Sequence, residues 1–205
     1  MGADIHFYIE YRQKGEEWQL HPRHVVSSDV AEDVPYYTDV SAAHRYYEFF
    51  GILAGVRGDG CIYRPRGFPH NLSKKLKLHT DHYLEHTPHW LTVDEFQKCL
   101  MKLDKRRRKE LKWQYKQDLQ SLANGEITQQ EFDYDWKVDP NDKRQKCHDI
   151  FFSYDAYPSN YWIHPGYDDI IPYIKNFEEE LKAEYILFDE DPPEYEFRFV
   201  FYFDS

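Results

Sequence analysis

Two ionisable residues close to the start of the chain, Asp4 and His6, have the spacing of side chains on one face of a β-strand. Apolar and polar residues alternate through residues 3–12, which is typical of a half-buried strand. Side chains two residues apart on a strand leave the same face about 6.5–7 Å from one another. A carboxylate and an imidazole so placed suit either a divalent metal ion or a histidine that an acid orients for proton transfer. The alternative is a polar strand face that is only solvated.

Four histidines follow one another at steps of three, four and three residues: His79, His82, His86 and His89. On a helix, His82 and His86 stand one turn apart and can chelate a metal ion. Pro88 interrupts such a helix, and no glutamate stands where an H-E-x-x-H motif needs its general base. The alternative is a partly charged helix end beside a structural Trp90. The candidate catalytic residues are His6, Asp4 and His86, and the candidate ligands of a divalent metal ion are Asp4, His6, His82 and His86.

Arginines and aromatic residues surround a loop rich in glycine and proline, residues 58–71. A guanidinium group binds phosphate through a planar fork of donors that lysine lacks, and an aromatic ring can stack on a base. The loop has no G-x-x-x-x-G-K-[ST] motif, so it is not a P-loop. The alternatives are arginines paired with surface acids and aromatic residues in the core. The candidate ligand-binding residues are Arg45, Arg57, Arg66, Tyr47 and Trp90.

Composition limits the classes of protein to consider. The 205 residues carry a net charge of −11, which disfavours general nucleic-acid binding but leaves room for a local basic patch. The strongest basic stretch is KRRRK at 105–109, for which a solvated helix face is the default and nucleic acid or an acidic segment of another copy are the alternatives. No apolar run approaches the roughly 20 residues of a membrane helix, and the three cysteines show no C-x-x-C spacing. We therefore expect a cytoplasmic protein.

Local patterns predict most of the secondary structure. Two capping boxes, Thr92 with Glu95 and Thr128 with Glu131, each predict the start of a helix, and the first helix should run about 30 residues to Asn124-Gly125. The other predicted helices cover residues 44–57, 73–86 and 167–185, the last with Pro172 at its start or at a kink, and the predicted strands cover 3–12, 17–20, 185–188 and 194–205.

These elements predict an α+β fold. The sheet, antiparallel or mixed, should contain both terminal strands, because each has an aromatic face too apolar to leave in water, with helices packed on one side. We expect one domain over residues 1–205, with a helical insertion at residues 98–150.

Five segments, MGADIH, RYYEFFGILAGVR, PRGFP, HTPHWLT and FRFVFYFD, are informative as a set. Together they resemble a family of small proteins of tailed bacteriophages and prophages whose members begin Met-Gly-x-Asp-Ile-His. The family has no settled biochemical activity. The resemblance therefore implies a phage-type protein in the cytoplasm of an infected bacterial host cell, and it does not imply a reaction.

The residues that point to chemistry are acids, histidines and arginines, which favour a pocket for a phosphorylated nucleotide ligand. We expect a phosphodiesterase that degrades a nucleotide immune signal, an anti-defence use that rests on the phage resemblance alone. One alternative is a non-catalytic sponge that sequesters such a messenger, and another is an acidic protein-binding inhibitor. The expected partner is a nucleotide-type small molecule, with no membrane and no general nucleic-acid binding, and homo-oligomerisation is left open.

Overall fold

The computed structural model describes residues 4–21, 47–58, 60–80, 86–136, 141, 165–188 and 190–204. The chain divides into two compact units, the first made of residues 1–97 and 164–205 and the second of residues 98–163. In sequence, the second unit is thus inserted into the first. The predicted insertion at residues 98–150 lies within it, and the prediction of a single domain stays a prediction.

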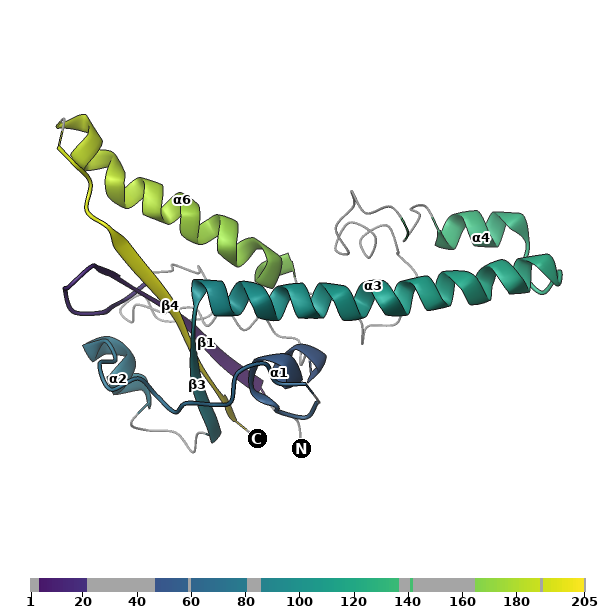
Figure 1. Cartoon of the computed structure of the whole chain (residues 1–205), viewed down its shortest axis with the longest axis horizontal. Helices are drawn as coiled ribbons and strands as arrows, with labels where there is room; N and C mark the ends of the chain where they lie inside the picture. Colours follow the sequence, from purple (N-terminus) through teal and green to yellow (C-terminus); the bar gives the residue numbers. More distant parts are fainter. Residues whose placement is uncertain are drawn as a thin grey trace, which may run out of the picture. The chain divides into compact units, whose positions relative to one another are not determined.

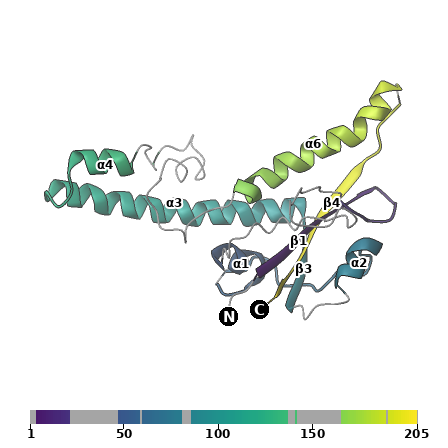
Figure 2. The same cartoon turned by 180° about the vertical axis from the view of Figure 1, so that it is seen from behind.

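A four-stranded antiparallel sheet forms the centre of the first unit, in the order β2-β1-β4-β3 (Figure 1). Its strands are β1 (Asp4–Gln13), β2 (Gln19–Leu20), β3 (His86–Thr92) and β4 (Tyr195–Asp204). The terminal strands pair along their whole length, from Asp4 opposite Asp204 to Gln13 opposite Tyr195. The start of β1 and the end of β4 therefore lie at the same end of the sheet (Figure 2). The prediction that both terminal strands belong to one sheet is confirmed.

One face of the sheet is aromatic and is covered by three helices: α1 (Tyr47–Ala54), the start of α3 (Val93–Ala123) and α6 (Pro165–Leu187). Phe50 of α1 packs on Phe203, with ring centroids 5.2 Å apart, and Phe96 of α3 packs on Phe199 at 4.4 Å. Phe177 of α6 packs on the aromatic residues at the other end of the sheet. Burying these rings away from water is the main stabilisation available to this unit. The predicted α+β fold, with helices on one side of the sheet, is confirmed.

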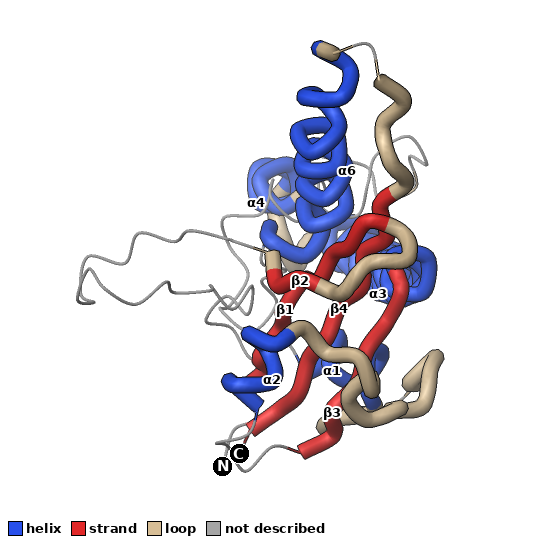
Figure 3. Tube along the Cα trace, turned by 90° about the vertical axis from the view of Figure 1, so that its left-hand side faces the viewer, coloured by secondary structure: helices blue, strands red, loops and turns tan. Residues whose placement is uncertain are grey.

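The opposite face of the sheet carries a shorter cover, made of the loop after residue 60 and the short helix α2 (Lys74–Thr80). Leu76 of α2 is fully buried in a cluster with Val200 and Tyr202, and Phe68 of the loop packs against the same cluster. Figure 3 shows β1, β4 and β3 side by side beneath these segments. This second layer positions the cleft described below.

Two local predictions were wrong. The helix expected over residues 73–86 ends at Thr80, and the residues after the gap in the described chain form β3, which pairs with β4. The strand expected over residues 185–188 does not form, because α6 continues to Leu187. Pro172, which was predicted to start this helix or to kink it, lies inside α6, which begins at Pro165.

In the second unit, α3 packs against α4 (Gln129–Asp135). Leu111 of α3 forms a small buried cluster with Phe132 and Trp136, and the Trp136 Nε1–H donates to Asp118 at 2.8 Å. The capping boxes predicted at the starts of α3 and α4 are both present, and Gly125 has a φ of 72° in the turn after α3. The helical hairpin thus follows directly from local sequence signals.

Both long helices have polar faces: α3 has 31 residues and α6 has 23. Across the part of the chain that the structure describes, no helix combines the length and the apolar character needed to cross a bilayer.

Gly51 of α1 allows the next segment of the chain to approach very closely. A Cβ atom added at Gly51 would lie 2.8 Å from the backbone of Gly58. We predict that Gly51→Ala lowers the free energy of unfolding by about 1–3 kcal/mol, because the backbone must move apart. Urea denaturation measures the change. An increase in stability, which the higher helix propensity of alanine alone would give, would contradict the contact.

Candidate functional site

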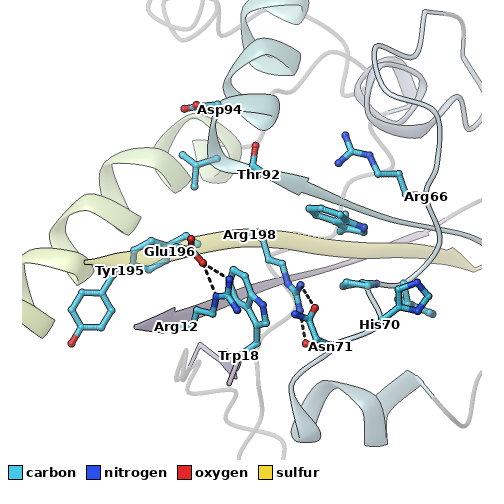
Figure 4. Close-up of a pocket in the computed structure, with 15 residues that line it drawn as sticks. Arg12, Trp18, Arg66, His70, Asn71, Thr92, Asp94, Tyr195, Glu196 and Arg198 are labelled. Atoms are coloured by element: carbon cyan, nitrogen blue, oxygen red, sulfur yellow. Dashed lines mark hydrogen bonds and ion pairs between the residues drawn. The ribbon is translucent and has the colours of Figure 1, made fainter. Parts of the chain in front are cut away.

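A cleft of about 900 Å³ lies in the first unit, on the face of the sheet that carries Arg12 and Arg198 (Figure 4). Its walls come from β1, β3 and β4, from residues 66–71 of the glycine-rich loop, and from the first turn of α3. Three arginines and two tryptophans line it, namely Arg12, Arg66, Arg198, Trp18 and Trp90. A cleft of this size can enclose a nucleotide-sized molecule.

A buried ion pair fixes the floor of the cleft. Arg198 of β4 donates from Nε and Nη2 to the Glu10 carboxylate of β1, at 2.7 and 2.6 Å, and the two side chains are only 5 % and 0 % exposed. Burial lowers the pKa of the Arg198 guanidinium, and the Glu10 carboxylate counteracts this. The same guanidinium donates to the side chain and backbone oxygens of Asn71, while the backbone N–H of Ser73 donates to Glu10 at 2.7 Å. The pair therefore ties the loop before α2 to the sheet.

A second pair of the same residue types lies beside the first in the reverse orientation. Arg12 of β1 donates to Glu196 of β4 at 2.6 Å, with side chains 25 % and 37 % exposed. The guanidinium of Arg12 lies 4.6 Å from the centroid of the Trp18 ring, and that of Arg198 lies 4.0 Å from it. One wall of the cleft is thus a tryptophan with two cations over its ring.

The opposite wall contains a third arginine on an aromatic ring. The Arg66 guanidinium lies 4.8 Å from the Trp90 centroid and 5.5 Å from that of Tyr63, and it pairs with Glu95. Glu95 also accepts from the backbone N–H of Thr92, which completes the capping box of α3. Burial alone would raise the pKa of Glu95, but the hydrogen bonds from Arg66 and Thr92 outweigh it and lower that pKa. The first turn of α3 therefore holds Arg66 in place.

His89 lies beneath this wall and is fully buried. Its Nδ1 accepts the backbone N–H of Arg66 at 3.3 Å, and its ring packs edge-on against Phe201. Burial lowers the pKa of His89 to about 4, and the charge of Arg66 adds to this effect. His89 is thus a neutral support for the loop at Arg66.

The predicted ligand-binding residues fall into three groups. Arg66 and Trp90 meet at the cleft. Arg57 and Tyr47 also meet, with the guanidinium 5.5 Å from the ring centroid, but neither lines the cleft. Arg45 lies outside the described residues. Of the residues predicted to bind a phosphorylated ligand, Arg66 and Trp90 therefore lie together at the cleft, and their binding role stays a prediction.

The predicted catalytic histidines lie elsewhere in the sheet. His6 stacks on Tyr202 with centroids 4.6 Å apart, whereas His86 stacks on Phe203 at 6.1 Å. Because neighbouring residues of β4 face opposite sides of the sheet, His6 and His86 lie on opposite faces. Neither lines the cleft, and the side chain of Asp4 lies outside what the structure describes.

The predicted metal site gains no geometric support from these positions. His86 belongs to β3 and not to a helix, so the helical spacing proposed for His82 and His86 does not apply to it. His82 lies outside the described residues. Within the ranges that the structure describes, no group of three or more His, Cys, Asp or Glu side chains is placed to hold a metal ion.

Four further residues that line the cleft do not stand out in the sequence, namely Arg12, Trp18, Asn71 and Arg198. The sequence does contain a pattern that could have identified Arg12 and Arg198. Each of the two terminal strands has a glutamate and an arginine two residues apart, Glu10 and Arg12 in β1 and Glu196 and Arg198 in β4. Pairing the two strands antiparallel places each glutamate opposite an arginine. The strands were predicted, and only their register was needed to find the pairs.

Comparison of the chain with protein-family models, with curated proteins and with solved structures finds no match. The resemblance to tailed-phage proteins stays a prediction.

The two Glu–Arg pairs provide a matched test of what holds the cleft. We predict that Glu10→Gln lowers the free energy of unfolding by about 3–5 kcal/mol, because it leaves the buried Arg198 without its counter-charge. The control, Glu196→Gln, should cost about 0–1 kcal/mol, because its pair is partly solvated. Urea denaturation of both variants measures the difference. Equal losses would show that burial of the Glu10 pair does not matter.

The buried His89 should make stability dependent on pH. Its pKa falls from 6.5 in the unfolded chain to about 4 in the fold, so folding favours the neutral form. Above pH 6.5 the imidazole is neutral in both states, and the free energy of unfolding has its full value. As the pH falls towards 4, the unfolded chain binds a proton that the fold does not, so the free energy of unfolding decreases by up to about 3 kcal/mol. In His89→Asn, which keeps an acceptor for the Arg66 N–H, the slope of unfolding free energy over this range should flatten. The exposed His70→Asn is the control, and an unchanged slope in His89→Asn would contradict the prediction.

Proposed function

We propose that the cleft binds a phosphorylated aromatic small molecule of the nucleotide class. The observation that supports this most directly is the presence of arginine–tryptophan contacts on both walls of one cleft. Guanidinium groups bind phosphate oxygens, and indole rings stack on bases. Each wall of a cleft of suitable volume thus carries both of the chemistries that a nucleotide needs.

The three arginines differ in how readily they can bind a phosphate. Arg198 is buried and is bonded to Glu10 and Asn71, so its role is structural. Arg12 and Arg66 are partly exposed, and each pairs with a carboxylate at the edge of the cleft. A phosphate group can replace such a carboxylate with little loss, because a partly solvated ion pair is worth only about 0–1 kcal/mol.

Hydrolysis of the bound molecule is a second candidate function. It is supported by His70, an imidazole that lines the cleft and is exposed to solvent. A histidine within reach of a phosphodiester can transfer protons at neutral pH. Retention and cleavage are separated by one measurement, the mass of the ligand after incubation. If the phage resemblance holds, either outcome removes a nucleotide signal from the host cell.

Arg66 and Arg57 form a matched pair for testing the proposal, since each lies over an aromatic ring and only Arg66 lines the cleft. We predict that Arg66→Lys weakens nucleotide binding by about 1–3 kcal/mol, because lysine keeps the charge but loses the planar fork. Arg57→Lys should leave affinity unchanged. Calorimetry with a panel of mononucleotides, dinucleotides and cyclic nucleotides measures binding, and mass spectrometry of the recovered ligand detects cleavage.

Two results would count against the proposal. Absence of binding across the panel would remove the nucleotide class, and an equal effect of the two lysine variants would place binding away from the cleft. Tryptophan fluorescence offers an independent check, because a base stacked on Trp90 should quench its emission, and Trp90→Leu should abolish that part of the signal.

A further inference from the structure

Six lysines of α3 form a single line along the helix, separated by steps of four, three, four, three and four residues: Lys98, Lys102, Lys105, Lys109, Lys112 and Lys116. Residues at this spacing lie on one face of an α-helix. Over 18 residues the line is about 27 Å long at the usual rise of 1.5 Å per residue. We call these six residues the lysine stripe. It lies wholly within the second unit.

The lysine stripe faces away from the buried side of α3. The buried residues of this part of the helix are Cys99, Leu103, Arg107 and Leu111, which follow each other at steps of four on the opposite face. Four of the stripe lysines are exposed, and Lys102 and Lys112 are half-buried. The stripe is therefore a surface of the second unit.

Two arginines of the KRRRK run, Arg107 and Arg108, contribute little to this surface. Arg107 is 1 % exposed, and Arg108 pairs with Asp104 at 3.7 Å. The lysines instead dominate the solvent-facing side. Between residues 98 and 116 the chain has nine Lys or Arg and two Asp or Glu, a net charge of +7 within a chain of net charge −11. Nine of the 26 lysines and arginines of the chain thus lie within this one stretch of α3.

A large aromatic side chain stands beside the stripe. Trp113 is 64 % exposed. It lies three residues before Lys116 and four after Lys109, so both lysines are its neighbours on the helix surface. An exposed indole among cations is the arrangement that proteins use to stack a base while lysines contact its phosphates.

We infer that the lysine stripe and Trp113 bind single-stranded nucleic acid, with the lysines along the phosphate backbone and the indole against a base. A partner helix in a coiled coil would need apolar residues at these heptad positions, and this helix has lysine there. A line of six lysines is instead complementary in charge to a long polyanion. This site is separate from the cleft and does not rest on the function proposed for it.

An acidic segment of a second copy is the competing partner, and its geometry fits less well. The most acidic stretch of α6 places Glu178, Glu179 and Glu180 in succession. Consecutive residues point around a helix and do not form a line, and Glu178 already pairs with Lys182. The observations therefore favour nucleic acid.

Binding can be measured by fluorescence anisotropy with the full chain and a fluorescein-labelled oligodeoxythymidine of about 20 nucleotides. If all six lysines contact phosphates, the plot of log affinity against log salt concentration should have a slope of about −4. The double variant K109Q/K112Q should weaken binding roughly 60-fold at about 50 mM salt and reduce the slope by about 1.4. Trp113→Ala should weaken binding by about tenfold and remove the quenching of tryptophan emission.

The control is K77Q/K175Q, which removes the same charge from two exposed lysines of α2 and α6. Its affinity and salt slope should match those of the wild-type chain, and circular dichroism should show all variants folded. Absence of binding by the wild-type chain at low salt would overturn the inference, as would equal losses in the two double variants. Binding of polyglutamate as tight as that of the oligonucleotide, unaffected by Trp113→Ala, would overturn it in favour of an acidic protein partner.

Discussion

The buried ion pair between Glu10 and Arg198 is the interaction on which the arrangement of the cleft depends. Removing two charges from water is costly, and it is tolerated only where further hydrogen bonds satisfy the groups. Here those bonds come from Asn71 and Ser73, which belong to the loop and not to the sheet. The requirement to solvate the pair therefore fixes where the loop lies. Phe68, three residues before Asn71, is in turn held against the buried cluster that contains Leu76, Val200 and Tyr202.

Charge compensation within the cleft separates its chemistry from that of α3. Each cleft arginine has a carboxylate partner, so the net charge of the cleft lining does not attract anions strongly. Selectivity there must come from stacking and from the geometry of the guanidinium forks, which salt screens weakly. The lysine stripe places six positive charges in a line on one helix face. Its attraction for anions is long-ranged and should fall steeply with salt. The two proposed sites thus differ in the kind of anion-binding chemistry that they offer.

Patterns confined to one element were sufficient to predict that element. Alternation gave both terminal strands, and two capping boxes gave the starts of α3 and α4. β3 was missed because residues 86–92 contain a proline and do not alternate, and their extended form depends on pairing with β4. The cleft was found only in part, at Arg66 and Trp90, because the contacts of Arg198 join residues 188 and 127 positions away. Such contacts require a register, which no local pattern contains.

The lysine stripe breaks a local rule of helix stability. Like charges three or four residues apart destabilise a helix by about 0.2–0.5 kcal/mol per pair, and the six lysines make five such neighbouring pairs. The total, about 1–2.5 kcal/mol, is a substantial fraction of the stability of an ordinary domain. Leu103 and Leu111 on the buried face can offset it, but they do not explain why the opposite face lacks glutamates that would remove the repulsion. Departures from local consistency concentrate at functional surfaces, and a polyanion is the partner that turns this repulsion into binding energy.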